Sequence, residues 1–287
     1  AQMKKFSMSD LGLLSYYLGV EVEQSRTAIT ICQSSYARKI VEDFGLKGCN
    51  PRSTPMENRL SLSKEDGSSP EDATAYRSVV GSLRYLVNIR PDIAYAVGIV
   101  SRYMESPTTQ HMAAVRHILR YISGTADYGL RYEKHTDGEP ELMGYSDSDH
   151  AGNVDDRKST SGFIFFLGSS PVSWQSQKQK VVALSSCEAE YIAGATAACQ
   201  GVWLSRLLAD LLGKEAAPTT LLVDNLSAIQ LCKSPVFHGR SKHIETHYHF
   251  IRETVENGKI TVEYVNTDDH LADILTKSLG RVRFQAM

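Results

Sequence analysis

The chain has 287 residues and a formal net charge of −2, so it can hold about two domains of ordinary size. This near-neutral charge excludes a uniformly basic protein, and any contact with phosphates has to come from local basic clusters. The five cysteines form no CxxC pair, which indicates reduced thiols in an intracellular protein, cytoplasmic or nuclear. No apolar run is long enough to span a membrane, and residues 1–10 do not resemble a signal peptide.

The first half of the chain is predicted to be mostly helical after a short β-hairpin. Residues 15–33 read as two strands joined at Ser25 and Arg26. A helix follows on an apolar stripe that begins at Tyr36. Residues 57–74 are rich in Ser, Glu, Asp and Gly and are predicted to be an exposed linker. Pro91 and Pro107 then divide residues 76–123 into about three helices.

From residue 129 onward, strands alternate with helices. Strands are predicted at residues 129–134, 141–148, 162–168 and 172–184. A long helix from Ser186 to Leu212 ends at Gly213, a typical C-cap. Next come a strand at 219–224, a helix at 225–232, a helix at 243–257, a strand at 259–265 and a helix that begins at 271. The order, with antiparallel strands before the long helix and parallel strands with helices after it, predicts an α/β domain with a mixed sheet and flanking helices.

Four acidic residues end predicted strands or lie on the apolar side of helices, where a carboxylate has no obvious structural role. They are Asp147, Glu190, Asp224 and Asp273. Singly, each has another explanation, such as a helix cap at Asp224 or a favourable helix-dipole charge at Asp273. Carboxylates that converge repel one another unless a divalent cation binds among them. Together they predict a site for two metal ions, of the kind that cleaves phosphodiesters.

Periodicity selects among neighbouring acids. In the helix at 186–212, the leucines at 204, 207, 208 and 211 predict the buried stripe, and whole turns back from Leu204 reach Glu190. Glu188 lies about 200° round the helix and is predicted to point away from the sheet. Asp147 and Asp149 share one strand face, so alternation does not separate them.

Several long motifs carry a family resemblance. The second half contains GYSDSDHAG, VSWQSQKQKVVALSSCEAEYIA, VDNLSAIQL and HLADILTK, and the first half contains FSMSDLGLLSYYLGVEV and YRSVVGSLRYLVNIRPDIAYAV. The former resemble the ribonuclease H domain of copia-type (Pseudoviridae) retrotransposon Pol polyproteins. The latter resemble the end of the reverse transcriptase palm, its thumb and its connection. The resemblance implies a mostly helical reverse transcriptase part, thumb-like and connection-like, at residues 1–128. It implies at 129–287 a ribonuclease H domain with a mixed five-stranded sheet and flanking helices, both within a longer polyprotein.

The resemblance also implies an activity, namely endonucleolytic cleavage of the RNA strand of RNA–DNA hybrids with two Mg²⁺ ions, or Mn²⁺. It assigns the metal-binding acids to Asp147, Glu190, Asp224 and Asp273, and so favours Asp147 over Asp149. His150 and His270 depart from the family pattern, and His270 is predicted to be an exposed loop residue, with a local proton carrier as the alternative. No Tyr-x-Asp-Asp motif occurs, so we expect no polymerase active site in this chain. Its expected partners are the hybrid, the polymerase palm and the integrase, in a cytoplasmic virus-like particle or the nucleus.

Contacts to the hybrid would recognise duplex shape and 2′-hydroxyl groups. The candidates are Arg157, Lys158, Ser159 and Thr160, then Gln177, Lys178 and Lys180, then Asn225, and then Arg240, Lys242 and His243. Solvated loop charge is the alternative for each cluster. The competing function is a catalytically silent remnant that binds nucleic acid or another protein.

Overall fold

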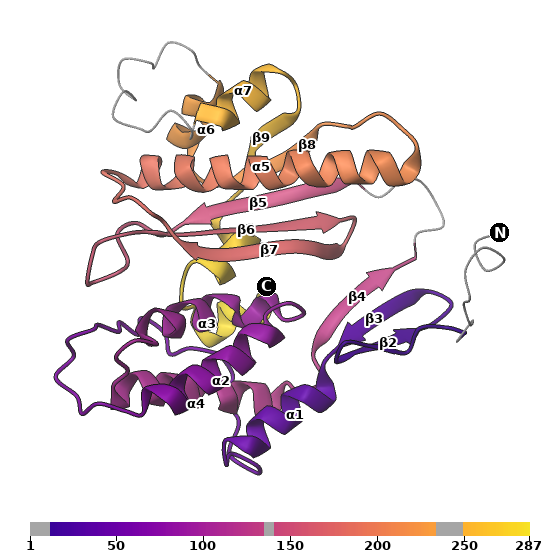
Figure 1. The fold of residues 1–287 in the computed structure, drawn as a ribbon. Helices are drawn as coiled ribbons and strands as arrows, with labels where there is room; N and C mark the ends of the chain where they lie inside the picture. Colours follow the sequence, from indigo (N-terminus) through magenta and orange to yellow (C-terminus); the bar gives the residue numbers. More distant parts are fainter. Residues whose placement is uncertain (1–11, 135–140, 234–248) are drawn as a thin grey trace.

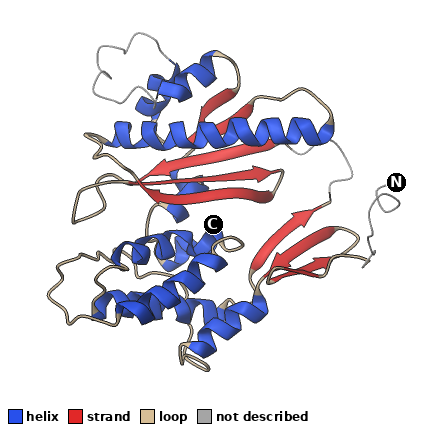
Figure 2. Ribbon diagram, in the orientation of Figure 1, coloured by secondary structure: helices blue, strands red, loops and turns tan. Residues whose placement is uncertain are grey.

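The computed structural model describes residues 12–134, 141–233 and 249–287 (Figure 1). The part of the predicted helix at 243–248, and with it Arg240, Lys242 and His243, lies outside these ranges. Two sheets, a helical layer and a second group of helices on the other side of the larger sheet make up the described chain (Figure 2). The helical layer and the long helix α5 (Ser186–Leu212) cover opposite faces of the larger sheet (Figure 1).

The smaller sheet is antiparallel and has four strands in the order β1-β2-β3-β4. The strands are β1 (Tyr16–Tyr17), β2 (Val20–Gln24), β3 (Ala28–Cys32) and β4 (Gly129–Glu133). The predicted hairpin is confirmed, since Ser25 N donates to Ala28 O at 2.8 Å between β2 and β3. The sequence grouped β4 with the later strands, but β4 pairs with β3. A short alternating run shows that a strand forms and does not specify its partner.

The helical layer contains four α-helices among the described residues, with short 3₁₀ turns between them. They are α1 (Ser34–Asp43), α2 (Ala73–Leu86), α3 (Ala94–Val100) and α4 (Thr109–Gly124), with η2 (Pro91–Ile93) and η3 (Ser101–Tyr103) flanking α3. The segment at 57–72 is irregular, as predicted, whereas Ala73 and Thr74 already belong to α2, and the segment is not simply exposed. Leu62 is buried in the helical core, and its carbonyl accepts a hydrogen bond from the Tyr103 hydroxyl at 2.7 Å.

The larger sheet confirms the predicted mixed five-stranded architecture. Its order is β7-β6-β5-β8-β9, antiparallel from β7 to β5 and parallel from β5 to β9. The strands are β5 (Leu142–Ser148), β6 (Thr160–Leu167), β7 (Ser170–Lys178), β8 (Thr219–Val223) and β9 (Ile260–Tyr264). The remaining elements are α6 (Leu226–Lys233), α7 (Phe250–Glu256), η6 (Thr267–Asp269), η7 (Leu271–Leu275) and α8 (Arg281–Ala286). The helix predicted from residue 271 is therefore a short 3₁₀ helix.

Helix α5 has the predicted bounds, and Gly213 caps it in the left-handed conformation. The buried stripe predicted from its leucines is wrong, because Leu207 and Leu211 are 40% and 75% exposed. Small residues face the sheet instead. A Cβ atom added to Gly201 would lie 3.2 Å from side-chain atoms of both Ile260 and Phe165. The helix packs too closely on the sheet for leucine to fit there.

The helical layer packs on the larger sheet through polar and apolar contacts. Trp174 Nε1 on β7 donates to Val87 O at 2.9 Å, after α2. Arg102 Nη2 in η3 donates to Thr160 Oγ1 at 2.9 Å, at the start of β6. An apolar cluster centred on Ile164 joins α3, β6 and η7. These contacts hold η7 against the sheet, close to the end of β5.

Candidate active site

Asp147 is a buried carboxylate near the end of the central strand β5, with 0% exposure. Its Oδ2 atom accepts a hydrogen bond from the Thr276 hydroxyl and lies 3.3 Å from Lys277 Nζ. Burial by itself would raise the pKa of Asp147, but Lys277 and Thr276 together lower it below its ordinary value. Asp147 is therefore ionised in a buried position.

Glu190 lies in the second turn of α5 and is 6% exposed. Its Oε1 atom accepts a hydrogen bond from Ser148 N at 3.3 Å. Within the described part of the chain, Oε2 is buried with no hydrogen-bond partner. Burial, and then the charges of Asp147 and Asp224, raise the pKa of Glu190 well above its ordinary value. Within the described ranges, no positive charge is found that lowers the pKa of this carboxyl group.

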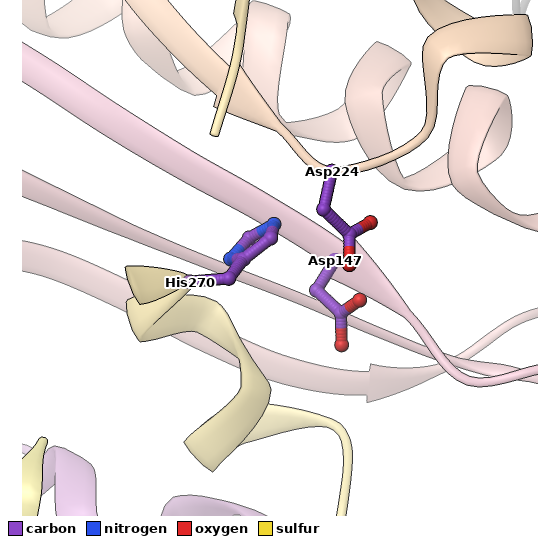
Figure 3. Close-up of side chains that lie close together, drawn as sticks. All are labelled: Asp147, Asp224 and His270. Atoms are coloured by element: carbon purple, nitrogen blue, oxygen red, sulfur yellow. The ribbon is translucent and has the colours of Figure 1, made fainter. Parts of the chain in front are cut away.

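Asp224 follows β8, which runs parallel to β5, so the two carboxyl ends meet at one edge of the sheet. Its Oδ2 atom accepts a hydrogen bond from Thr267 Oγ1 at 3.1 Å. Asp147, Asp224 and His270 offer ligand atoms that all lie within 4.8 Å of one another (Figure 3). The carboxylates of Asp147, Asp224 and Glu190 are therefore supplied by β5, by the residue that follows β8 and by α5.

Asp273 belongs to η7 and is 1% exposed. Lys277 Nζ lies 2.8 Å from its Oδ1 atom, and Arg283 of α8 donates to its Oδ2 atom. Burial and the charge of Asp147 raise the pKa of Asp273, against the opposing effect of Lys277. The other three acids predicted from the sequence therefore lie around Asp147, and each of the four has different hydrogen-bond and charged partners.

His270 is completely buried, at 0% exposure, so the prediction of an exposed loop histidine is wrong. Its Nε2 atom lies 3.0 Å from Ser146 O, and Ala272 N donates to its Nδ1 atom at 3.3 Å. A carbonyl only accepts and an amide only donates, so Nε2 carries the proton of a neutral ring. Neither nitrogen then has a lone pair free for a metal ion, despite the short distances to Asp147 and Asp224. The ring instead links η7 to β5 beside Asp147.

Glu188 was predicted to point away from the sheet. Its carboxylate accepts a hydrogen bond from Leu184 N at 2.9 Å, in the turn that precedes α5. The residue is only 6% exposed, so it is buried against this turn instead of standing in solvent. Its charge lies near the N-terminus of the helix, where the helix dipole favours it.

The predicted nucleic-acid contacts differ in accessibility. Ser159 and Thr160 are buried and bonded to Ala151 N and Arg102, so their assignment to a contact surface is not supported. Asn225 Oδ1 accepts from Ala228 N at 3.0 Å and caps α6. The other described candidates are exposed or half-buried, and Lys178 pairs with Asp156. These are Arg157, Lys158, Gln177, Lys178 and Lys180.

Three residues of the site were missed from the sequence, namely Thr276, Lys277 and Arg283. One signal was available, since Asp273 and Lys277 are spaced i, i+4 and form an ion pair. Thr276 and Lys277 contact Asp147 although they lie 129 and 130 positions from it along the chain, and no local sequence pattern specifies these contacts.

None of the helices in the described ranges is long and apolar enough to cross a membrane.

A mixed sheet in this order, with buried acids at the end of its central strand, defines a ribonuclease H-like fold. A family model described as reverse transcriptase (RNA-dependent DNA polymerase) matches residues 1–58. The retrovirus-related Pol polyprotein from transposon RE1 of Arabidopsis thaliana is 42% identical, over 98% of this chain and 19% of its own length. The corresponding protein of transposon TNT 1-94 from Nicotiana tabacum is 40% identical, over 98% of this chain and 22% of its own length.

The chain therefore belongs to the copia-type retrotransposon Pol polyprotein family, and it spans about a fifth of the length of these relatives. Among solved structures, the foamy viral protease-reverse transcriptase in complex with RNA/DNA hybrid has a TM-score of 0.49 at 14% identity, over 92% of this chain and 30% of that chain. The N-terminal RNase H domain of a Mycobacterium tuberculosis protein has a TM-score of 0.34 at 14% identity, over 51% of this chain and 95% of that chain.

Proposed function

We propose that this chain is a metal-dependent endoribonuclease that cleaves the RNA strand of RNA–DNA hybrids. The observation that carries the proposal is the buried Oε2 atom of Glu190 beside Asp147 and Asp224, which has no hydrogen-bond partner among the residues that the structure describes. Such a cluster is unfavourable unless a cation neutralises it. All its donors are carboxylate oxygens, which suit Mg²⁺ or Mn²⁺. The residues present therefore fit a divalent cation.

Two sets of side chains would hold two ions. Asp147, Glu190 and Asp224 would bind one, and Asp147 and Asp273 would bind the other, with Asp147 shared. Bound ions of this kind lower the pKa of the attacking water and stabilise the leaving oxygen. The chain itself holds Asp147 in its ionised form, and His270 keeps η7 beside β5 through Ser146. The acids are thereby placed before the substrate arrives.

The hybrid would lie across the acid cluster and follow the exposed polar residues at the end of β7. A groove of about 280 Å³ there is lined by residues that include Gln177, Lys178 and Lys180. Lysine and glutamine side chains contact phosphate and sugar groups without reading the base sequence. The polymerase and integrase segments of the same polyprotein would be its partners, in a cytoplasmic particle or in the nucleus.

The test is cleavage of an end-labelled RNA–DNA hybrid in Mg²⁺, with EDTA as the negative control. Asp224→Asn is nearly isosteric and should leave the chain folded but abolish cleavage. Asp210→Asn, at an exposed position of α5, should cleave at the wild-type rate. Duplex DNA should remain intact, since it lacks the 2′-hydroxyl groups. If the folded wild-type chain cleaves nothing in Mg²⁺ or Mn²⁺, the silent-remnant function replaces this one.

A further inference from the structure

Two basic side chains of the described chain contact the acids, and only one of them, Lys277, lies between two carboxylates; Arg283 contacts Asp273 alone. Lys277 follows η7, and its Nζ atom lies 2.8 Å from Asp273 Oδ1 and 3.3 Å from Asp147 Oδ2. The side chains of these two aspartates are 2% and 1% exposed, whereas that of Lys277 is 37% exposed. A single ammonium group therefore bridges two carboxylates that are almost completely withdrawn from water.

A divalent cation held by both Asp147 and Asp273 would need the position that the ammonium group occupies. The oxygen atoms within 3.4 Å of Nζ belong to the pair to which we assign one divalent cation. A divalent ion at this position and the ammonium group would repel each other at close range. They would also compete for the same lone pairs of the Asp147 and Asp273 oxygens, so the cation and the ammonium group cannot occupy this position together.

We propose that Lys277 is the resident counter-ion of the Asp147–Asp273 pair and that it competes with a divalent cation for this position. The inference rests on the proposed metal-dependent function. Lysine carries its charge on a flexible four-carbon stem, and the partial exposure of Lys277 gives the ammonium group a path to solvent. Thr276 still donates to Asp147 after the displacement. The position shared with Asp273 is therefore filled at a higher metal concentration than the position formed with Glu190 and Asp224.

The experiment compares two charge-removing variants of the full chain. Lys277→Met keeps most of the stem and removes the charge from the site. Lys259→Met removes an equal charge from an exposed residue just before β9, at the end of the sheet remote from the acids. Isothermal titration with Mg²⁺ and with Mn²⁺ gives the affinities, and thermal unfolding in EDTA gives the stability without metal.

We expect Lys277→Met to bind metal at the weaker position roughly tenfold more tightly, because a repelling charge has been removed. In EDTA its melting temperature should fall, because the buried Asp147 loses the ammonium group beside it and Asp273 keeps only its ion pair with Arg283. Lys259→Met should change neither quantity. Should Lys277→Met fail to fold in EDTA, Lys277→Gln serves as the second variant, with the same expectation for metal binding.

Three outcomes would contradict these expectations. Metal binding by a folded Lys277 variant that is equal to or weaker than that of the wild type overturns the competition. Equal melting temperatures for Lys277→Met and Lys259→Met in EDTA overturn the counter-ion role, and this measurement uses no metal. A wild-type chain that binds neither Mg²⁺ nor Mn²⁺ contradicts the proposed function instead.

Discussion

Replacement of Glu190 by glutamine should stabilise the metal-free chain while it abolishes cleavage. Glutamine keeps the shape of the side chain and can still accept the hydrogen bond from Ser148 N. Its amide group can donate to the ionised Asp147, and it no longer adds negative charge beside Asp224. Relief of an unpartnered buried group amounts to about 1–3 kcal/mol. At about 2–4 °C per kcal/mol, this shift is measurable by thermal unfolding in EDTA.

The effect should depend on pH in a defined direction. Folding raises the pKa of Glu190, so between its unfolded and folded pKa values the folded chain keeps a proton that the unfolded chain has released. The contribution of Glu190 to stability is then lost as the pH rises through this window. Glutamine does not titrate. The difference in melting temperature between Glu190→Gln and the wild type should therefore widen as the pH increases.

Glu188→Gln is the matched control, two residues earlier in the same helix. It weakens the hydrogen bond from Leu184 N and removes a charge near the helix N-terminus, at a cost of about 0.5–1 kcal/mol. Cleavage should persist. If Glu190→Gln melts below the wild type in EDTA at neutral pH, or if Glu188→Gln abolishes cleavage and Glu190→Gln does not, the electrostatic reasoning is refuted.

Three further predictions follow from the geometry. Metal affinity should increase with pH, because Glu190 has a raised pKa and must lose its proton to bind the metal ion. Titration calorimetry in two buffers with different ionisation enthalpies measures the number of protons released, and a metal affinity that does not change with pH would contradict the prediction. His270→Ala removes two hydrogen bonds from a fully buried ring and should cost about 2–4 kcal/mol in denaturant unfolding, so a loss below about 0.5 kcal/mol would show that the ring holds nothing in place. Gly144→Ala would place a Cβ atom 2.3 Å from the Phe165 ring and should lower the free energy of unfolding by about 1–3 kcal/mol. Gly98→Ala should be tolerated, because its Cβ atom would lie 3.7 Å from the nearest atom, Ser176 Oγ.

The sequence by itself determined which elements form and in what order. Residues 186–212 were predicted as one helix ending at Gly213, and the structure has the same bounds, because helix periodicity and a left-handed cap are local properties. The succession of antiparallel strands, long helix and parallel strands was predicted for a similar reason, since alternation and connection length limit how consecutive strands pair, whereas the number of five strands came from the family resemblance. The acids at strand ends could be predicted because the end of a strand can be located in the sequence, and with it the residue found there.

Tertiary structure alone decided what each element faces. β4 pairs with β3, about a hundred residues earlier, and Leu207 and Leu211 stay exposed because α5 approaches the sheet too closely. His270 is buried because η7 folds against β5, and Lys277 reaches Asp147 across 130 positions. Such contacts depend on the shape of surfaces from distant segments, and burial decides whether a charged side chain is solvated or must find a partner.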